Sequence, residues 1–201
     1  RMIIKPSHIK ARAYGYSLAN SVIDAYHAGD FVPSSKPSIT VHSTEIELGL
    51  ENFVLSLGTL LGIIDTDLKF SLIPPFVRYL SEVAFIQLGD ASIIGIPGEL
   101  YPEIAIGGIE NPEGADYVIA PQEVPHLRSQ LPGKLNLMVN LANDAIGYII
   151  PKSEWDDDPP WIYGEEEETY GEVVPLGPNT GPIIHENIVK LIKESKKKIR
   201  F

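Results

Sequence analysis

The chain has 201 residues, with 16 lysines and arginines against 27 aspartates and glutamates, and it contains no cysteine. A net charge of −11 repels phosphate backbones, which argues against nucleic acid as a partner. The lack of cysteine excludes disulfides, a thiolate nucleophile and a cysteine-ligated metal. We expect one domain over residues 1–201, because a chain of this length can bury a substantial core.

The ends of the chain leave its cellular location open. No run approaches the roughly 18 apolar residues that span a bilayer, so we expect no membrane span. The start lacks the apolar stretch of a signal peptide. Arg1 precedes Met2, which favours a processed, cloned or internal terminus and leaves room for the rest of a longer protein before it.

The first third of the chain carries helical and strand patterns in turn. Ser7 precedes the first helical pattern and is its expected cap. Alternation of apolar and polar residues predicts the first strand, with an irregularity at Ser43 and Thr44. The expected elements are helices over 9–28 and 51–63 and strands over 38–50 and 69–73.

The strongest local signal is a β-hairpin that leads to a single acid. Strands over 83–88 and 91–96 flank a two-residue Gly-Asp turn, and the second strand is mostly apolar, as in a strand buried on both faces. It stops at Pro97-Gly98 and then presents Glu99. An acid at the end of a strand often binds a ligand or a metal, or takes part in proton transfer. The alternative is an acid that favours the start of the next helix.

The second half holds further strands and a long loop. We expect the strands over 135–141 and 145–150 to pair, with Tyr148 at the far end of the pair. Aromatic residues interrupt an acidic, proline-rich loop over 152–182, which favours a functional loop over a linker. The other expected elements are helices over 101–107 and 182–198 and a brief strand over 116–120.

Together these elements predict an α/β fold of the mixed α+β kind. Its centre is a mixed sheet with a β-hairpin core and flanking helices, and we expect it to be part of a larger catalytic domain.

Three motifs and the hairpin resemble one family. The motifs are Pro97-Gly98-Glu99 at a strand end, Gly147-Tyr148 in an apolar run, and a Tyr-Gly-Glu segment at Tyr170 that leads through Gly-Pro into the last helix. With the hairpin they resemble the neutral/alkaline ceramidases, the zinc-dependent amidases that cleave N-acylsphingosines. The resemblance covers roughly residues 81–192 and implies the C-terminal half of such a catalytic domain.

The resemblance implies roles for three residues. Glu99 would give zinc a carboxylate ligand, Tyr148 would give a second ligand, and Tyr170 would help polarise the scissile carbonyl of a lipid-like amide. Without the resemblance, Tyr148 is also typical of a half-buried strand tyrosine, and Tyr170 of a loop aromatic packed on the body.

Part of the expected site is missing from this sequence. In the family, two histidine ligands and a serine segment come from the part of the chain before the matched region. None of the five histidines fits that pattern: His8, His27, His42, His126 and His185. The sequence favours surface or helix-end positions for His27 and His185 and loops for His8 and His126. We therefore expect an N-terminal segment or a second chain to carry the histidines, and residues 1–201 alone to be inactive.

Two acidic features allow more than one interpretation. The run of Asp156, Asp157 and Asp158 with residues 165–168 can bind calcium or magnesium through oxygen ligands, but it is also typical of a solvated face. Asp144 can orient a metal ligand or fix a turn with its side chain.

The rival functional hypothesis is a non-catalytic binding or scaffold module of the same fold. In it, the aromatic loop from Trp155 to Tyr170 holds an apolar partner, and the metal site is incomplete.

Overall fold

The computed structural model describes residues 7–29, 36–64, 66–167 and 170–198. Contacts divide the chain into two compact units, Arg1–Pro37 and Ser38–Phe201. Arg1 and Met2, on which the expectation about the terminus depends, lie outside the described residues, as does Glu168 of the acidic run.

The first unit contains the predicted helix, α1 (His8–Ala28). The Ser7 side chain accepts a hydrogen bond from the backbone N–H of Lys10 at 3.2 Å, and Gly29, at φ 69°, ends the helix in the left-handed conformation. His8 is the first helical residue, so the loop expected for it is wrong. No residue of α1 is buried.

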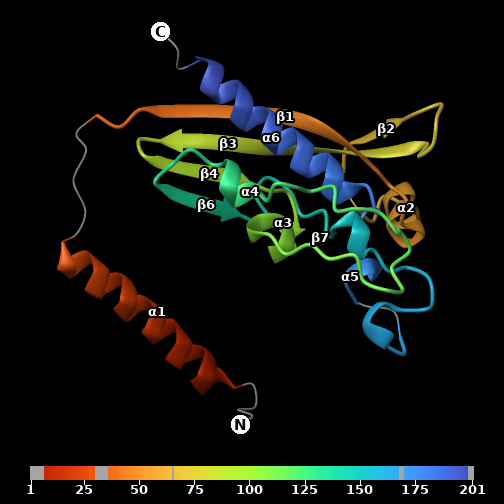
Figure 1. Ribbon diagram of the computed structural model, residues 1–201, viewed down its shortest axis with the longest axis horizontal. Helices are drawn as coiled ribbons and strands as arrows, with labels where there is room; N and C mark the ends of the chain where they lie inside the picture. Colours follow the sequence, from red (N-terminus) through yellow and green to blue (C-terminus); the bar gives the residue numbers. More distant parts are fainter. Residues whose placement is uncertain (1–6, 30–35, 65, 168–169, 199–201) are drawn as a thin grey trace. The chain divides into compact units, whose positions relative to one another are not determined.

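The second unit is built on a mixed sheet, which confirms the predicted fold class (Figure 1). The strand order is β1-β3-β4-β6, and β2 also pairs with β3. β4 and β6 are parallel, whereas the other pairs are antiparallel. The strands are β1 (Ile39–Gly49), β2 (Leu68–Phe70), β3 (Val77–Leu88), β4 (Ala91–Gly95) and β6 (Leu135–Val139).

The predicted hairpin is confirmed, with a longer first strand than expected. Leu88 pairs with Ala91 around the turn, and β3 extends back to Val77. This length gives every residue of β1 a partner in β3, so the pairing is continuous and the irregularity expected at Ser43 and Thr44 is wrong.

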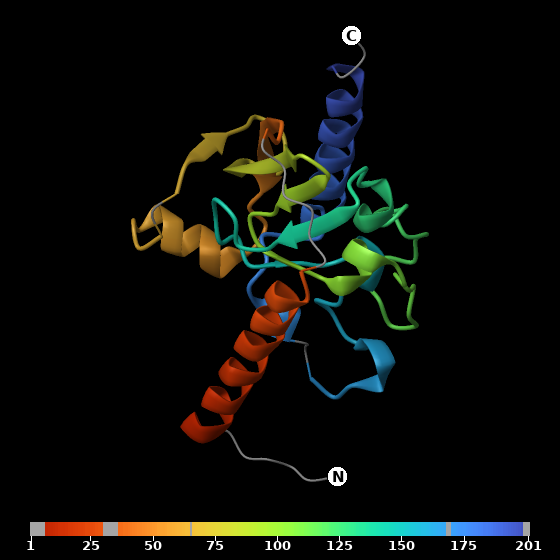
Figure 2. The ribbon, with the colours of Figure 1, turned by 90° about the vertical axis from the view of Figure 1, so that its left-hand side faces the viewer.

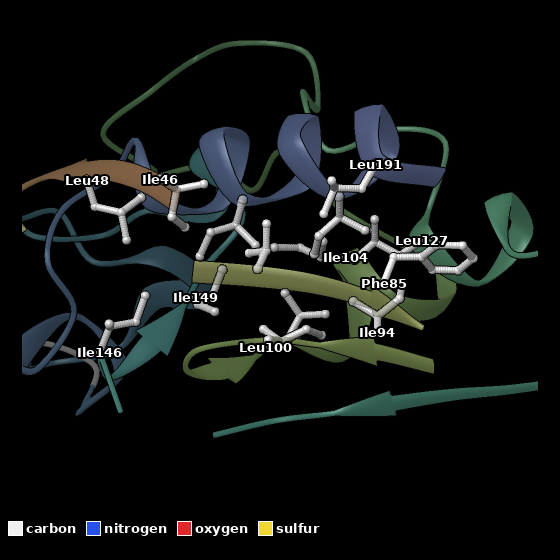
Figure 3. Packing of buried hydrophobic residues seen from close by; sticks show 14 of the residues in the cluster. Ile46, Leu48, Phe85, Ile94, Leu100, Ile104, Leu127, Ile146, Ile149 and Leu191 are labelled. Atoms are coloured by element: carbon white, nitrogen blue, oxygen red, sulfur yellow. The ribbon is translucent and has the colours of Figure 1, made fainter. Parts of the chain in front are cut away.

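The helices of the second unit are α2 (Phe53–Leu60), α3 (Pro102–Ile106), α4 (Leu127–Gln130), α5 (Tyr170–Val173) and α6 (Thr180–Lys198). The predicted last helix is α6, which packs along β1 and β3 (Figures 1 and 2). Its buried side chains recur at helical spacing as Ile184, Ile188 and Leu191. They form one core with the inner face of the sheet, including Phe85 and Ile94 (Figure 3).

The segment between α3 and β6 contains α4, which the sequence pattern did not predict, and the strand expected over 116–120 is wrong. The backbone N–H of Asp116 donates to the carbonyl of Trp155 at 3.0 Å, so this segment packs on the long loop and joins no strand ladder.

That long loop is ordered by short 3-10 turns, η1 (Lys152–Glu154) and η2 (Ile162–Gly164), followed by α5. Trp155 is buried and Tyr163 is exposed. The rival hypothesis expected Trp155 at the surface to hold a partner, and this part of it is wrong. No helix in the described ranges combines the length and apolar character needed to cross a bilayer.

Candidate metal and substrate site

Glu99 and Tyr148 face one another across a second, two-stranded sheet. β5 (Glu99–Leu100) and β7 (Tyr148–Ile149) pair in parallel, with Glu99 directly opposite Tyr148. The N–H of Glu99 donates to the carbonyl of Gly147 at 2.9 Å, and the N–H of Tyr101 donates to that of Ile149 at 3.1 Å.

The pairing predicted between the strands over 135–141 and 145–150 is therefore wrong. The chain turns sharply after β6, with positive φ at Leu141 and Asn143. The N–H of Ala142 then donates to the carbonyl of Ile96 at 2.9 Å, which carries the following residues toward β5.

Two glycines allow this close pairing. A Cβ on Gly98 would lie 2.4 Å from the carbonyl oxygen of Gly147. A Cβ on Gly147, which has φ +87°, would lie 2.4 Å from the carbonyl oxygen of Val174. Three backbone segments therefore lie in close contact here: the one before Glu99, the one before Tyr148 and the one after α5.

Alternation decides which way the two side chains point. Leu100 and Ile149 are buried and belong to the core beneath α6. Successive residues of a strand point to opposite sides, so Glu99 and Tyr148 point away from that core. Both are half-buried, which leaves them accessible to a ligand.

Two further tyrosines surround Tyr148. Tyr170, the first residue of α5, meets it edge to face with ring centroids 6.0 Å apart and an interplanar angle of 77°. Tyr101 does the same at 6.1 Å and 75°. The structure thus brings together all three predicted site residues. Tyr101 was not among the predicted site residues, although it stands two residues after Glu99, the spacing of side chains on one side of a strand.

Tyr101 also lies against α5. A Cβ on Gly171 would lie 2.2 Å from the phenol oxygen of Tyr101, so a larger residue at position 171 would require the Tyr101 ring to move. Gly171, the residue after Tyr170, therefore lies beside Tyr101, and Tyr101 packs on Tyr148.

Glu99 raises the pKa of the Tyr148 phenol. Its negative charge is the main cause, followed by partial burial, the side-chain hydrogen bond between the two groups and the nearby Tyr170. Glu99 therefore favours the neutral phenol, which donates a hydrogen bond to the carboxylate. A bound dication would reverse this preference, because a metal ion dominates the local charge.

The donor pair fits part of a zinc site. Glutamate oxygen is a known zinc ligand, and the phenol oxygen lies beside it. A catalytic zinc site needs three protein ligands and an open position for water. Within the described part of the chain, no three histidine, cysteine, aspartate or glutamate side chains are grouped so that they can hold a metal ion. The roles of Glu99 and Tyr148 as ligands stay predictions.

His185 and His126, both in the second unit, lie against backbone carbonyl groups. His185 is buried in α6, with Nε2 2.9 Å from the carbonyl oxygen of Pro125, so its expected surface position is wrong. His126 caps α4, and its Nδ1 lies 3.3 Å from the carbonyl oxygen of Ala105. His42 lies in β1, and His27 is in the last turn of α1.

Asp144 acts as an anchor for the segment before Tyr148. Its carboxylate accepts hydrogen bonds from Tyr79 Oη at 3.0 Å and Ser81 Oγ at 2.8 Å, and from the N–H of Ala145 at 2.8 Å. The contacts with β3 are a tether that the sequence pattern did not predict, and both roles expected for Asp144, in a turn and in orienting a metal ligand, stay predictions.

The acidic loop is only partly a solvated face. Asp156 is buried and accepts a hydrogen bond from the N–H of Ile162 at 3.1 Å, while burial raises its pKa. Glu154 is also buried and accepts from the N–H of Glu110 at 2.6 Å. These two acids hold loops together, and the calcium or magnesium site stays a prediction.

Comparisons with known proteins give one distant structural likeness. No protein-family model and no curated protein matches the sequence. The structure resembles neutral ceramidase from Pseudomonas aeruginosa, with 11% sequence identity, a TM-score of 0.42 and 81% of this chain covered. The chain spans 29% of that ceramidase chain.

Proposed function

We propose that this chain supplies the glutamate–tyrosine half of a zinc-dependent amide hydrolase site, related to the neutral ceramidases. The observation that carries the proposal is the register of β5 and β7, which sets Glu99 directly opposite Tyr148. These two residues come from motifs that are 49 positions apart in the sequence (148 − 99). The same motifs underlie the family resemblance.

The residues have separate tasks in this proposal. Glu99 and Tyr148 would hold the metal from one side, and the remaining ligands would come from an N-terminal segment or a second chain. When bound, zinc lowers the pKa of a coordinated water to about 7 and polarises a carbonyl. Tyr170 is mostly exposed and packs on Tyr148, so its phenol is available to donate a hydrogen bond to the carbonyl oxygen of the substrate. A lipid-like amide, such as an N-acylsphingosine, is the proposed substrate.

The test is metal analysis of the full natural protein or complex that contains this chain, together with hydrolysis of an N-acylsphingosine. We expect about one zinc per chain, lost in Glu99→Gln. Tyr170→Phe keeps the ring contact with Tyr148, so it should retain zinc and lose hydrolysis. Glu113→Gln, an exposed acid elsewhere, is the control. A natural protein without zinc, or hydrolysis that survives Glu99→Gln, would contradict the proposal.

The second candidate is the non-catalytic module, and one observation favours it: the described residues alone do not form a group of metal ligands. Under this hypothesis, Tyr101, Tyr148 and Tyr170 form a packed aromatic surface around Glu99 with no metal. The same metal analysis separates the two, because a module of this kind holds no zinc in its natural assembly.

A further inference from the structure

Two neighbouring segments of the second unit contain no charged residue and leave large apolar side chains exposed. Residues 53–64 comprise α2 and the turn after it, and residues 70–77 run from the end of β2 into β3. We call these two segments together the apolar tip. Figure 1 shows α2 and the β2–β3 turn at one end of this unit. Exposed side chains of the apolar tip include Phe53, Leu60 and Leu72. A patch of this kind is typical of a surface that binds a partner or a membrane.

An apolar groove joins the two segments of the tip. It has a volume of about 200 Å³ and lies between α2 and the strands β2 and β3, from which Leu60, Phe70 and Val77 line it. Ser56 is the one polar residue among the described residues of its lining, and its hydroxyl donates to the carbonyl of Asn52 at 2.8 Å. The groove therefore offers a ligand apolar contact and no unbonded hydroxyl proton.

The end of α2 satisfies its polar groups locally. The N–H groups of residues 61–64 donate to carbonyls of residues 57–59. Thr59 Oγ1 donates to the carbonyl of Leu55 at 2.8 Å. An unbonded N–H or hydroxyl is costly in hydrocarbon, because no water is there to replace the lost hydrogen bond. These local bonds therefore lower the cost of placing the end of α2 in an apolar medium.

The β2–β3 turn presents few hydrogen-bond donors. The N–H of Ser71 donates to the carbonyl of Phe76 at 2.8 Å, and Pro74 and Pro75 have no backbone N–H. Leu72, in the same turn, is 100% exposed. The turn thus presents a fully exposed leucine on a backbone that offers little to a partner with hydrogen-bonding groups.

Two cations lie at the base of this turn, where the apolar residues end. Lys69 in β2 pairs directly with Arg78 in β3, one position before Phe70 pairs with Val77. Both cations contact the carboxylate of Glu47 in β1, so two positive charges share one negative charge. Long basic side chains at the edge of an apolar segment are suited to lipid phosphates at the headgroup level.

A bilayer fits these features better than a protein or a single lipid chain does. A groove of about 200 Å³ encloses only a short aliphatic segment, and the exposed Ile63 and Leu72 lie outside it. A protein partner normally brings hydrogen-bonding groups to the rim of an apolar interface. A bilayer supplies hydrocarbon for the tip and phosphates for Lys69 and Arg78.

We propose that the apolar tip is a membrane-docking surface, by which the second unit inserts shallowly into one leaflet of a zwitterionic bilayer. Leu60 and Leu72 would enter the hydrocarbon, while Lys69 and Arg78 would lie at the phosphates. The tip has no charge and the chain carries −11, so apolar contact drives the binding and anionic lipid is not required. The inference does not depend on the zinc site proposed around Glu99.

Vesicle flotation tests the docking in the full natural protein that contains this chain. The vesicles are of dioleoylphosphatidylcholine, in about 0.1 M and about 1 M salt. We expect flotation at both, because salt does not screen apolar contacts. Leu72→Asp should weaken binding about tenfold or more, because it brings a carboxylate to the hydrocarbon. Val118→Asp, at a valine of the second unit that is 87% exposed outside the tip, is the matched control and should float like the natural protein.

A fluorescent probe locates the inserted segment. Leu72→Cys and Val118→Cys are each labelled with NBD, a dye whose emission rises in hydrocarbon. The full protein used has no other cysteine, and residues 1–201 contribute none. On addition of the same vesicles, emission should rise about twofold or more from the dye at position 72 and stay unchanged at position 118. An unchanged signal at position 72 in protein that floats would show that another surface binds the vesicles.

Three further results would overturn the proposal. The first is a natural protein that does not float, or that floats equally well with Leu72→Asp. The second is flotation that needs anionic lipid and is lost at about 1 M salt, which would assign binding to a charged surface such as the basic end of α6. The third is a dimer, seen by sedimentation velocity, that Leu72→Asp dissociates while no flotation occurs, because a second copy would then cover the tip.

The docking and the proposed function can fail separately. Glu99→Gln, which is expected to lose zinc, should float like the natural protein, because Glu99 lies outside the apolar tip. Flotation without zinc in the natural protein would leave the docking intact and remove the proposed function. Zinc without flotation would do the reverse.

Discussion

At the residue scale, the pair of Glu99 and Tyr148 couples a carboxylate to a phenol whose pKa it raises. A raised pKa favours the neutral phenol in the folded chain. The resulting stability is complete below the ordinary tyrosine pKa of about 10 and is lost as pH rises through the folded value. A cation bound between the two groups would oppose this effect and favour loss of the phenol proton.

Replacing Glu99 tests this coupling. Glu99→Gln removes the charge that is the main cause of the shift, so the pKa of Tyr148 should fall toward about 10. An absorbance titration of tyrosinate, with Tyr148→Phe to assign the transition, measures it. Tyr163, whose pKa burial and the Glu110 hydrogen bond raise to about 12, is the internal control and should not move. An unchanged Tyr148 transition would show that Glu99 does not act on the phenol.

Asp144 gives a second prediction at this scale. Asp144→Ala removes the acceptor of the buried hydroxyls of Tyr79 and Ser81 and should lower the free energy of unfolding by about 1–3 kcal/mol. Urea denaturation measures the change. Asp90→Ala breaks only the exposed ion pair with Lys134 and should cost at most about 1 kcal/mol. Equal losses in the two variants would refute the anchoring role.

At the scale of elements, the pairing of β5 with β7 depends on a glycine. Gly147→Ala combines a positive φ with a contact of 2.4 Å to the carbonyl oxygen of Val174. Gly62→Ala has a similar φ of +69° but open space, so it isolates the backbone strain of about 1–2 kcal/mol. Urea denaturation should show a loss for Gly147→Ala that exceeds the loss for Gly62→Ala by about 1–3 kcal/mol.

Hydrogen exchange tells where that loss arises. The Glu99 amide donates to the Gly147 carbonyl, so its exchange should accelerate in Gly147→Ala. An amide as well protected as in the natural chain would show that the register survives the substitution, and that Gly147 does not control the position of Glu99.

The elements of the second unit differ in how far the sequence predicts them. Helix α6 and the β3–β4 hairpin have strong periodicity and turn signals, so their existence followed from local pattern. β5 and β7 have two residues each, too few for a period, and their pairing is set by glycine contacts between distant segments. The sequence motifs therefore predicted Glu99, Tyr148 and Tyr170 as site residues. The periodicity of the sequence predicted neither the β5–β7 register nor the presence of Tyr101 beside them.

The burial of polar side chains was also not predicted from the sequence. His185 lies in a sequence pattern typical of a surface helix, and Asp156 lies in a run of acids typical of a solvated face. Both side chains are nevertheless buried and hydrogen-bonded to backbone groups. Their burial depends on loops that pack from elsewhere in the chain, which a local pattern does not contain.

At the scale of the whole molecule, the described surface is uneven. The core beneath α6 is closed, while the opposite side of the sheet in the second unit carries a row of exposed apolar side chains and the paired acids Glu45 and Glu82. A stable isolated domain normally covers such a row or replaces it with polar residues. In the described residues of the second unit, that row stays largely exposed, as at Val41 and Leu137.

Residues 1–201 alone should neither retain zinc nor hydrolyse an N-acylsphingosine. If Glu99 and Tyr148 are ligands, they supply two oxygens, and the negative charge of Glu99 opposes loss of the Tyr148 phenol proton. A catalytic zinc site needs at least three protein ligands. The purified chain is loaded with zinc, dialysed against metal-free buffer, and assayed for metal and for release of fatty acid. The double variant Glu99→Gln/Tyr148→Phe is the control and should match it in both measurements. Zinc that remains at about one per chain and disappears in the double variant would contradict this prediction, because this chain would then complete the site itself.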